Sequence, residues 1–147
     1  MSRRKAYVSD CMSDEPVTVS PSAKLAEAYD LMAENEIRRL LVVRSNELLG
    51  IVTLSDIVRA LPSLLGQDDS ERDTASSLLL TEKAVSDVMA WDPVTIGADD
   101  TIQDAAERML EYQVSGLPVV DGNRPVGIIT ESDIFRLVVD SWAEDDD

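Results

Sequence analysis

The sequence predicts an α+β fold built from two copies of one β-α-β-β-α unit. Residues 8–60 and 85–137 align without a gap at an offset of 77, and 21 of these 53 positions are identical. Each copy combines apolar residues at helical spacing with short apolar runs that end in turn residues. A duplication this regular predicts two repeats related by a pseudo-twofold axis and forming one module.

The first half of each copy predicts a strand followed by a helix. Val17–Val19 alternates as a strand does, and Pro21-Ser22 favours a helix start. Apolar residues then recur at helical spacing, so each helix is expected to bury one face. These residues are Leu25, Ala28, Leu31 and Met32 in the first copy and Ile102, Ala105, Ala106, Met109 and Leu110 in the second.

The second half of each copy predicts a strand hairpin and a closing helix. Compact apolar runs flank short turn sequences, which is typical of paired antiparallel strands. The expected strands are Leu40–Val43 with Leu49–Thr53 and Leu117–Val120 with Val126–Thr130. The closing helix of the first copy begins after Thr53 and is expected to falter at Pro62, because proline interrupts a helix.

The remaining segments predict a linker and a tail. Residues 61–84 separate the copies; within them residues 66–77 are polar and without periodicity, and Leu78-Leu79-Leu80 is expected to pack against core or partner. Residues 138–147 are predicted to be an acidic C-terminal tail. A repeat of about 53 residues is small for independent stability, so we expect the two copies to share a core.

Composition excludes several classes of protein. A net charge of −16 argues against nucleic acid and anionic membranes as partners, because both require clustered lysine and arginine. No apolar run reaches membrane-spanning length and no signal region follows the first residues, which predicts a cytoplasmic protein. With no histidine and one cysteine, a Cys/His metal site is excluded. Cys11 aligns with Val88 and is expected to be a small core hydrophobe rather than a reactive thiol.

Each copy ends in the motif Gly-x-x-Thr-x-Ser-Asp-Ile, which begins at Gly50 and at Gly127. The duplicated unit with this motif resembles a cystathionine β-synthase (CBS) domain pair, also called a Bateman module. The resemblance implies a regulatory homodimer that binds an adenosyl ligand in clefts between the repeats and signals to an effector protein. The sequence offers no catalytic histidine, cysteine-based pair or Walker-type loop, so we expect no enzyme activity.

The Thr-x-Ser-Asp segment has two readings at a strand-to-helix junction. Hydroxyls and free backbone N–H groups at a helix start favour bound anions, and a carboxylate there suits ribose hydroxyls. Thr53-x-x-Asp56 and Thr130-x-x-Asp133 also fit a capping box, which needs no ligand.

The two copies differ just before the middle strand. Arg38-Arg39 stands in the first copy where the second has Ser115-Gly116. Guanidinium groups match phosphate oxygens, although a solvated pair that balances local carboxylates remains the alternative. This stretch is similar to the nucleotide-binding repeat of the AMP-activated protein kinase gamma subunit, where His-Arg takes the Arg-Arg place. The substitution leaves AMP, ADP and ATP open as ligands.

The resemblance implies two sites, and the remaining residues follow from it. The first would use Asp56 for ribose, Arg38, Arg39, Thr53 and Ser55 toward phosphate, and Ala90, Thr95 and Val114 around the base. The mirror site would use Thr130, Ser132 and Asp133 with Ser13, Thr18 and Ile37. Lacking an arginine pair, it suits adenosine or S-adenosylmethionine, or no ligand at all.

Two functions follow as hypotheses. The first is an energy-sensing regulatory protein that binds an adenine nucleotide and signals to a partner. The second is a structural or interaction module that dimerises, with helix caps where ligands would otherwise lie. Ligand-induced stabilisation separates the two, because only a bound ligand can raise the melting temperature.

Overall fold

The computed structural model describes residues 6–60 and 82–145, and these form two compact units. Of the described residues, 17–60 and 82–93 make up one, called here the central unit. Residues 6–16 and 94–145 make up the other, called here the terminal unit. Three features expected from the sequence lie outside the described residues: the polar linker at 66–77, the apolar Leu78-Leu79-Leu80 and the helix end at Pro62.

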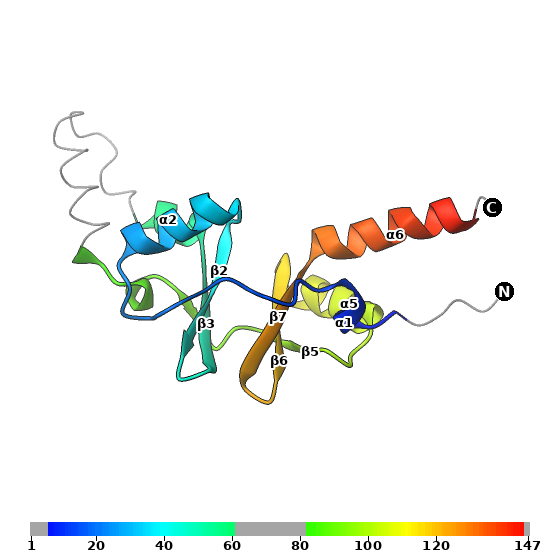
Figure 1. The fold of residues 1–147 in the computed structure, drawn as a ribbon, viewed down its shortest axis with the longest axis horizontal. Helices are drawn as coiled ribbons and strands as arrows, with labels where there is room; N and C mark the ends of the chain where they lie inside the picture. Colours follow the sequence, from blue (N-terminus) through cyan, green and yellow to red (C-terminus); the bar gives the residue numbers. More distant parts are fainter. Residues whose placement is uncertain (1–5, 61–81, 146–147) are drawn as a thin grey trace. The chain divides into compact units, whose positions relative to one another are not determined.

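The central unit contains a four-stranded sheet in the order β1-β2-β3-β4 (Figure 1). β1 pairs in parallel with β2, whereas β2 with β3 and β3 with β4 are antiparallel. Its elements are β1 (Thr18–Val19), α2 (Leu25–Asn35), β2 (Arg39–Arg44), β3 (Glu47–Thr53), α3 (Leu54–Arg59), the 3₁₀ turn η2 (Val85–Asp87) and β4 (Ala90–Trp91).

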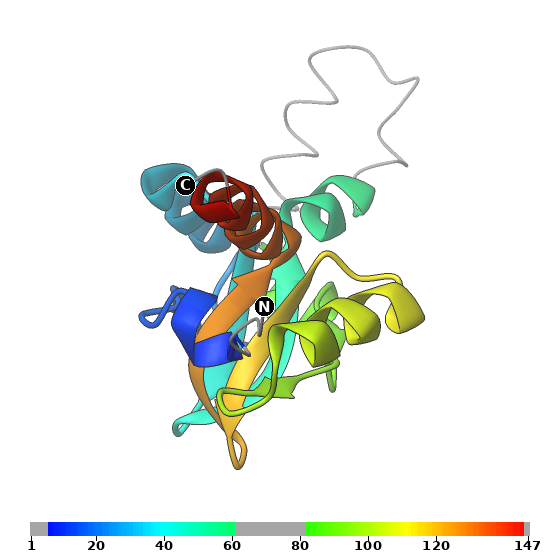
Figure 2. The same cartoon turned by 90° about the vertical axis from the view of Figure 1, so that its right-hand side faces the viewer.

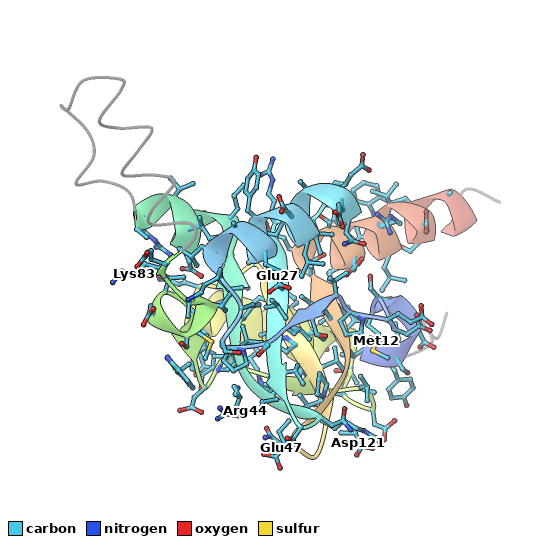
Figure 3. All side chains as sticks on the ribbon, turned by 60° about the vertical axis from the view of Figure 1, so that its left-hand side comes forward. Met12, Glu27, Arg44, Glu47, Lys83 and Asp121 are labelled. Carbon is cyan, nitrogen blue, oxygen red and sulfur yellow. The ribbon has the colours of Figure 1, made fainter. Side chains whose placement is uncertain are left out.

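The terminal unit repeats this plan with a three-stranded sheet in the order β5-β6-β7. Its elements are α1 (Val8–Cys11), β5 (Ile96–Gly97), α5 (Ile102–Tyr112), β6 (Gly116–Asp121), β7 (Arg124–Thr130) and α6 (Glu131–Asp145). In Figure 2, α1 and α5 lie on either side of β6 and β7. The hairpin ends carry charged side chains that are exposed to solvent, Arg44 and Glu47 in the central unit and Asp121 in the terminal unit (Figure 3).

The fold is α+β, as the sequence predicts, and both hairpins and both α2 and α5 form at the expected places. Two boundaries differ. α2 begins at Leu25 rather than at Pro21-Ser22, because the carbonyls of Pro21 and Ala23 accept hydrogen bonds from the N–H groups of Ser86 (3.0 Å) and Val85 (2.8 Å). That stretch therefore forms turns whose carbonyls bind the backbone of residues 85 and 86.

The second difference lies at the C-terminus. The acidic tail expected from residue 138 is helical as far as Asp145, because α6 continues through it. Val138, Val139 and Trp142 keep helical spacing with the preceding turns, so the apolar periodicity that predicts a helix extends into the segment read as a tail.

The two copies exchange their lead segments, residues 7–13 and 84–90. Val8 of the first copy is fully buried in the core of the terminal unit, and Val85 of the second is fully buried in that of the central unit. The backbone follows the same rule: Val8 N–H donates to the Asp100 carbonyl at 2.8 Å, and Val85 N–H donates to Ala23. Each of the two cores therefore contains residues of both copies.

The predicted apolar faces are buried or, at Leu31 and Ala106, half-buried, except at Leu110. Leu25, Ala28 and Met32 lie in the central core, and Ile102, Ala105 and Met109 lie in the terminal core. Leu110 was expected on the buried face of α5 but is 80% exposed, because its position is one residue past the buried stripe. Among the described residues, no helix combines the length and apolar character needed to cross a membrane.

The exchange makes a stability prediction. Val8→Ala removes two methyl groups from a fully buried position and should lower the free energy of unfolding by about 2 kcal/mol. Val58→Ala, at a position that is 58% exposed, should change it by less than about 0.5 kcal/mol. Urea denaturation of both variants measures the difference. Equal stabilities would show that the lead segment does not support the terminal core.

Candidate functional site

Each of the two motifs forms a strand-to-helix junction, and the two junctions have the same hydrogen-bond pattern. In the central unit the Thr53 hydroxyl accepts from the Asp56 N–H at 3.1 Å, and Asp56 Oδ2 accepts from the Thr53 N–H at 2.9 Å. In the terminal unit the corresponding distances are 3.4 Å to the Thr130 hydroxyl and 2.8 Å to Asp133 Oδ2. The capping box considered from the sequence is therefore present at both junctions.

The second oxygen of each aspartate faces an arginine one turn along the helix. Arg59 Nη2 lies 2.5 Å from Asp56 Oδ1, and Arg136 Nη1 lies 4.0 Å from Asp133 Oδ1. The arginine side chains are 73% and 72% exposed, whereas the aspartates are 13% and 14% exposed. Because each arginine is largely exposed, solvent weakens its attraction to the aspartate, and the arginine can give way to a ligand hydroxyl. Each carboxylate thus keeps one oxygen fixed by backbone and offers the other.

The structure places the two adjacent arginines in different surroundings. Arg39 is the first residue of β2 and lies directly opposite Thr53 of β3. Side chains opposite each other in an antiparallel pair share a face of the sheet. Because Leu40 and Val42 enter the core, alternation puts Arg39 on the other face of the sheet, together with Thr53. Arg39 therefore belongs to the motif junction.

Arg38 joins the junction through its backbone. Its carbonyl accepts from the Leu54 N–H at 2.8 Å, which ties the start of α3 to the start of β2. Arg38 itself is exposed, and it lines a groove of about 320 Å³ together with Tyr29 of α2, Glu36 and Leu54. Sequence reasoning treated Arg38 and Arg39 as one pair; in the structure Arg39 is the first residue of β2, and Arg38 lies in the bend before it.

The other predicted residues divide between the units. With Asp56, the central unit contains Arg38, Arg39, Thr53, Ser55 and Ala90, and it also contains Thr18 and Ile37 of the predicted mirror site. With Asp133, the terminal unit contains Ser13, Thr130 and Ser132, and it also contains Thr95 and Val114 of the predicted first site. Within the terminal unit the Thr95 carbonyl accepts from Arg108 Nη1 at 2.6 Å, a contact that the sequence did not suggest.

Ala90 and Ser13 occupy equivalent places in their units. Ala90 of β4 pairs with Ile51, and Ser13 forms an isolated bridge with Ile128. Through these contacts, Ala90 of the first predicted site and Ser13 of the mirror site each lie against the strand that ends in the motif threonine. The lead segments therefore contribute to both junctions, although each comes from the other copy.

The motif glycine explains how the lead segment reaches that strand. A Cβ atom at Gly50 would lie 2.4 Å from the Ala90 carbonyl oxygen, and one at Gly127 would lie 2.6 Å from that of Ser13. Only glycine permits so close an approach of two backbones. Its role was missed in the sequence, where its presence in both copies was the available signal.

Cys11 belongs to the terminal unit and lies within reach of the charge of Asp133. The residue is half-buried and packs against the terminal core, as expected from its alignment with Val88. Burial raises the pKa of its thiol, and the negative charges of Asp10 and Asp133 raise it further. The thiol is therefore held protonated at neutral pH.

No group of three or more metal-ligating side chains occurs in residues 6–60 and 82–145. The chemistry available at the junctions is therefore that of hydroxyls, carboxylates, backbone N–H groups and guanidinium. This set can hold a polyol and an anion side by side.

Comparison with known proteins identifies the class to which the chain belongs. The CBS domain model matches residues 8–63 and 85–140. The chain therefore belongs to the CBS domain family, as the repeated motif indicated, and carries two such domains.

Solved structures of CBS pairs share the fold over nearly the whole chain. The CBS domain pair of protein MJ0100, in complex with 5′-methylthioadenosine and S-adenosyl-L-methionine, is 28% identical with a TM-score of 0.77, covering 94% of this chain and 99% of that one. CBSX2 in complex with AMP is 28% identical with a TM-score of 0.76, covering 92% and 97%.

A further similar structure is that of protein MJ1225 from Methanocaldococcus jannaschii, described as a proposed archaeal homologue of the AMPK gamma subunit. It is 30% identical with a TM-score of 0.76, covering 91% of this chain and 48% of that chain. Among curated relatives, a homoserine O-acetyltransferase from Methanohalobium evestigatum is 34% identical over 134 residues, which is 90% of this chain but 24% of that protein. The chain spans 24% to 46% of the first three curated relatives.

The raised pKa of Cys11 predicts its reactivity. The alkylation rate should rise with pH, because the thiolate is the reacting form. The pH at which the rate reaches half its maximum should be higher for the folded protein than for the urea-unfolded chain. The same shift makes the folded state lose stability as pH rises past the ordinary thiol pKa of about 8.5. Iodoacetamide labelling followed by mass spectrometry measures both profiles. Coincident midpoints would contradict the assigned environment.

Proposed function

We propose that this chain is a regulatory CBS-pair protein that binds an adenine nucleotide, AMP, ADP or ATP, and passes the bound state to an effector protein. The observation that carries the proposal is the junction of β3 and α3. There Arg39 lies opposite Thr53, and Asp56 presents one carboxylate oxygen beyond the oxygen that caps the helix. The AMP-bound and S-adenosylmethionine-bound structures of similar CBS pairs support the ligand class.

Each group at this junction has a role in the proposal. Asp56 Oδ1, which Arg59 contacts in the structure, accepts hydrogen bonds from ribose hydroxyls after Arg59 moves aside. Hydrogen bonds to a charged acceptor are worth about 1.5–3 kcal/mol, more than a surface ion pair of about 0–1 kcal/mol. Arg39 with the hydroxyls of Thr53 and Ser55 binds phosphate, for which guanidinium has matched geometry.

The junction of β7 and α6 suits a ligand with less phosphate. Ser115 and Gly116 take the places of the arginines, and the exposed Glu131 takes the place of Leu54. An extra carboxylate beside the junction repels phosphate. We therefore propose adenosine or S-adenosylmethionine as the ligand class for the Asp133 site.

The proposal includes a homodimer that acts in the cytoplasm, and a regulatory rather than catalytic role. The enzyme name of one relative belongs to a protein of which this chain matches 24%. The second candidate function is an interaction module without ligand. The observed capping boxes support this second function, because helix capping explains the presence of the motif residues without a ligand. These residues are Thr53, Asp56, Thr130 and Asp133.

Asp56→Ala separates binding from capping when it is compared with Asp104→Ala. Asp104 forms the same capping box with Thr101 at the start of α5, outside both predicted sites. Each variant should lose about 0.5–2 kcal/mol of stability through its cap. Nucleotide at about 100 times its dissociation constant should stabilise the wild-type protein and Asp104→Ala by about 2.7 kcal/mol, and Asp56→Ala far less.

Melting temperatures with AMP, ADP, ATP, adenosine and S-adenosylmethionine measure these shifts. If Asp56→Ala and Asp104→Ala gain equally from nucleotide, Asp56 is only a helix cap. If no compound shifts the wild-type protein, the interaction module is the better account.

The arginines make a second test of the same site. Arg38→Ala with Arg39→Ala should weaken AMP or ATP far more than adenosine, and Arg39→Ala alone should cause most of the loss, about tenfold or more. Arg38→Ala is the matched control, since its side chain lines the groove beside Tyr29. Calorimetric titration of AMP and adenosine into each variant measures the effect. Equal losses for both ligands, or first occupancy of the Asp133 site by nucleotide in a soaked crystal, would contradict the assignment.

A further inference from the structure

The two motif junctions carry opposite net charge. The charged side chains of each junction come from its closing helix and from the residues at the start of its middle strand. The junction of β3 and α3 has three arginines and one aspartate, a net charge of +2: Arg38, Arg39, Asp56 and Arg59. The junction of β7 and α6 has two carboxylates and one arginine, a net charge of −1: Glu131, Asp133 and Arg136. Because the two junctions have the same backbone pattern, the difference comes from side chains alone.

A groove runs along α6 at the negatively charged junction. It has a volume of about 650 Å³ and is lined by Glu131, Ser132, Phe135, Arg136 and Val139. This volume lies within the range of small-molecule sites, about 300–1,000 Å³. Residues at this spacing share one side of a helix. The groove therefore combines a carboxylate, a hydroxyl, an aromatic ring and a guanidinium.

Arg136 connects this groove with the motif aspartate. It lines the groove, and its Nη1 atom lies 4.0 Å from Asp133 Oδ1, which is beyond the range of a hydrogen bond. The arginine side chain is 72% exposed, so it can turn toward an anionic group of a ligand. A ligand whose ribose binds Asp133 can therefore extend along α6 into the groove.

The equivalent positions of the central unit have a different chemistry. At an offset of 77, Leu54 stands for Glu131 and Val58 for Phe135, whereas the serine and the arginine are the same in both copies. Glu131 is exposed, and Phe135 is 66% exposed. The carboxylate and the ring are thus properties of one copy only, and the shared fold does not require them.

We propose that Glu131 and Phe135 make the Asp133 site selective for a positively charged adenosyl ligand, an adenosyl sulfonium, over neutral adenosyl compounds. The inference rests on the ligand site proposed above for this junction and names the residues that select its ligand. The ribose binds Asp133, and the sulfonium lies between the Glu131 carboxylate and the Phe135 ring. Arg136 binds the carboxylate of the amino acid arm.

The preference follows from the charge of the groove. A cation is attracted by a carboxylate and by the face of an aromatic ring, and a neutral thioether gains neither attraction. Both contacts are weak at an exposed position, and together they amount to about a tenfold difference in affinity. The same carboxylate repels the phosphate of a nucleotide, which leaves the Asp133 site to the cation.

The overall charge of the chain requires a control. A net charge of −16 attracts any cation, although salt screens this attraction beyond about 8 Å at physiological ionic strength. The control must therefore remove a carboxylate from the same helix but outside the groove. Asp140 of α6 fits this purpose, because it is exposed and lies outside the residues that line the groove.

Three compounds separate the contributions to binding. S-adenosylhomocysteine adds the amino acid arm to adenosine, and S-adenosylmethionine adds a methyl group and the sulfonium charge. Calorimetric titrations of the wild-type chain are made with saturating AMP, which occupies the Asp56 site under the proposed function. S-adenosylmethionine should bind about tenfold more tightly than S-adenosylhomocysteine, and adenosine more weakly than either.

Glu131→Gln and Asp140→Asn form a matched pair, because each neutralises one exposed carboxylate of α6. Asp140→Asn should keep the tenfold preference for the sulfonium. Glu131→Gln should reduce it to about threefold, because only the contact with the ring remains. Phe135→Leu is the second deciding variant and should reduce the preference to a similar value, because only the carboxylate remains.

Four results would overturn the inference. They are equal affinities of the wild-type chain for the sulfonium and the thioether, an undiminished preference in Glu131→Gln and Phe135→Leu, loss of the preference in Asp140→Asn, and displacement of S-adenosylmethionine by AMP. If AMP binds the wild-type chain in any of these cases, the proposed nucleotide site stands and only the selectivity of the Asp133 site is refuted. An absence of binding by every compound contradicts both proposals.

Discussion

The exchange of lead segments is the constraint on which the rest of the structure depends. Neither core is complete without residues of the other copy, since Val8 fills the terminal core and Val85 the central one. The same segments lie against the strands that end in the motif threonines, through Ala90 at Ile51 and Ser13 at Ile128. The position of each candidate site therefore depends on the chain crossing twice between the units.

This constraint accounts for the first residue of the motif. Gly50 and Gly127 lie where the lead segment passes over the strand, and a side chain at either position would meet a backbone carbonyl. The remaining motif residues then serve the junction that follows. The motif thus combines a packing requirement at its start with capping and candidate binding groups at its end.

The aspartates of the motif hold two roles in one carboxylate. Oδ2 accepts from the backbone of the threonine and fixes the helix start, whereas Oδ1 faces the side chain of a largely exposed arginine. A fixed acceptor needs little reorganisation to bind a hydroxyl, which favours affinity. The helix cap and the proposed ribose contact therefore reinforce each other, so the capping box and the binding hypothesis are compatible.

Local patterns predicted most of the fold, and long-range contacts account for the remainder. The offset of 77, the apolar periodicity and the Thr-x-x-Asp spacing gave the repeats, the hairpins and the caps. They did not predict the exchange of lead segments, because the two copies have similar sequences. A lead segment could therefore pack against the core of either copy. The exposure of Leu110 was also missed, because a shift of a single position decides which side of a helix a residue takes.

The central claim is that the wild-type chain binds an adenine nucleotide at the Asp56 junction. Isothermal titration calorimetry of AMP into the wild-type protein and into Asp56→Ala tests it most directly. The account predicts saturable binding to the wild-type protein and a much weaker isotherm for Asp56→Ala, which retains its fold. An absence of saturable heat in the wild-type protein up to millimolar AMP, or identical isotherms for the two proteins, would contradict it.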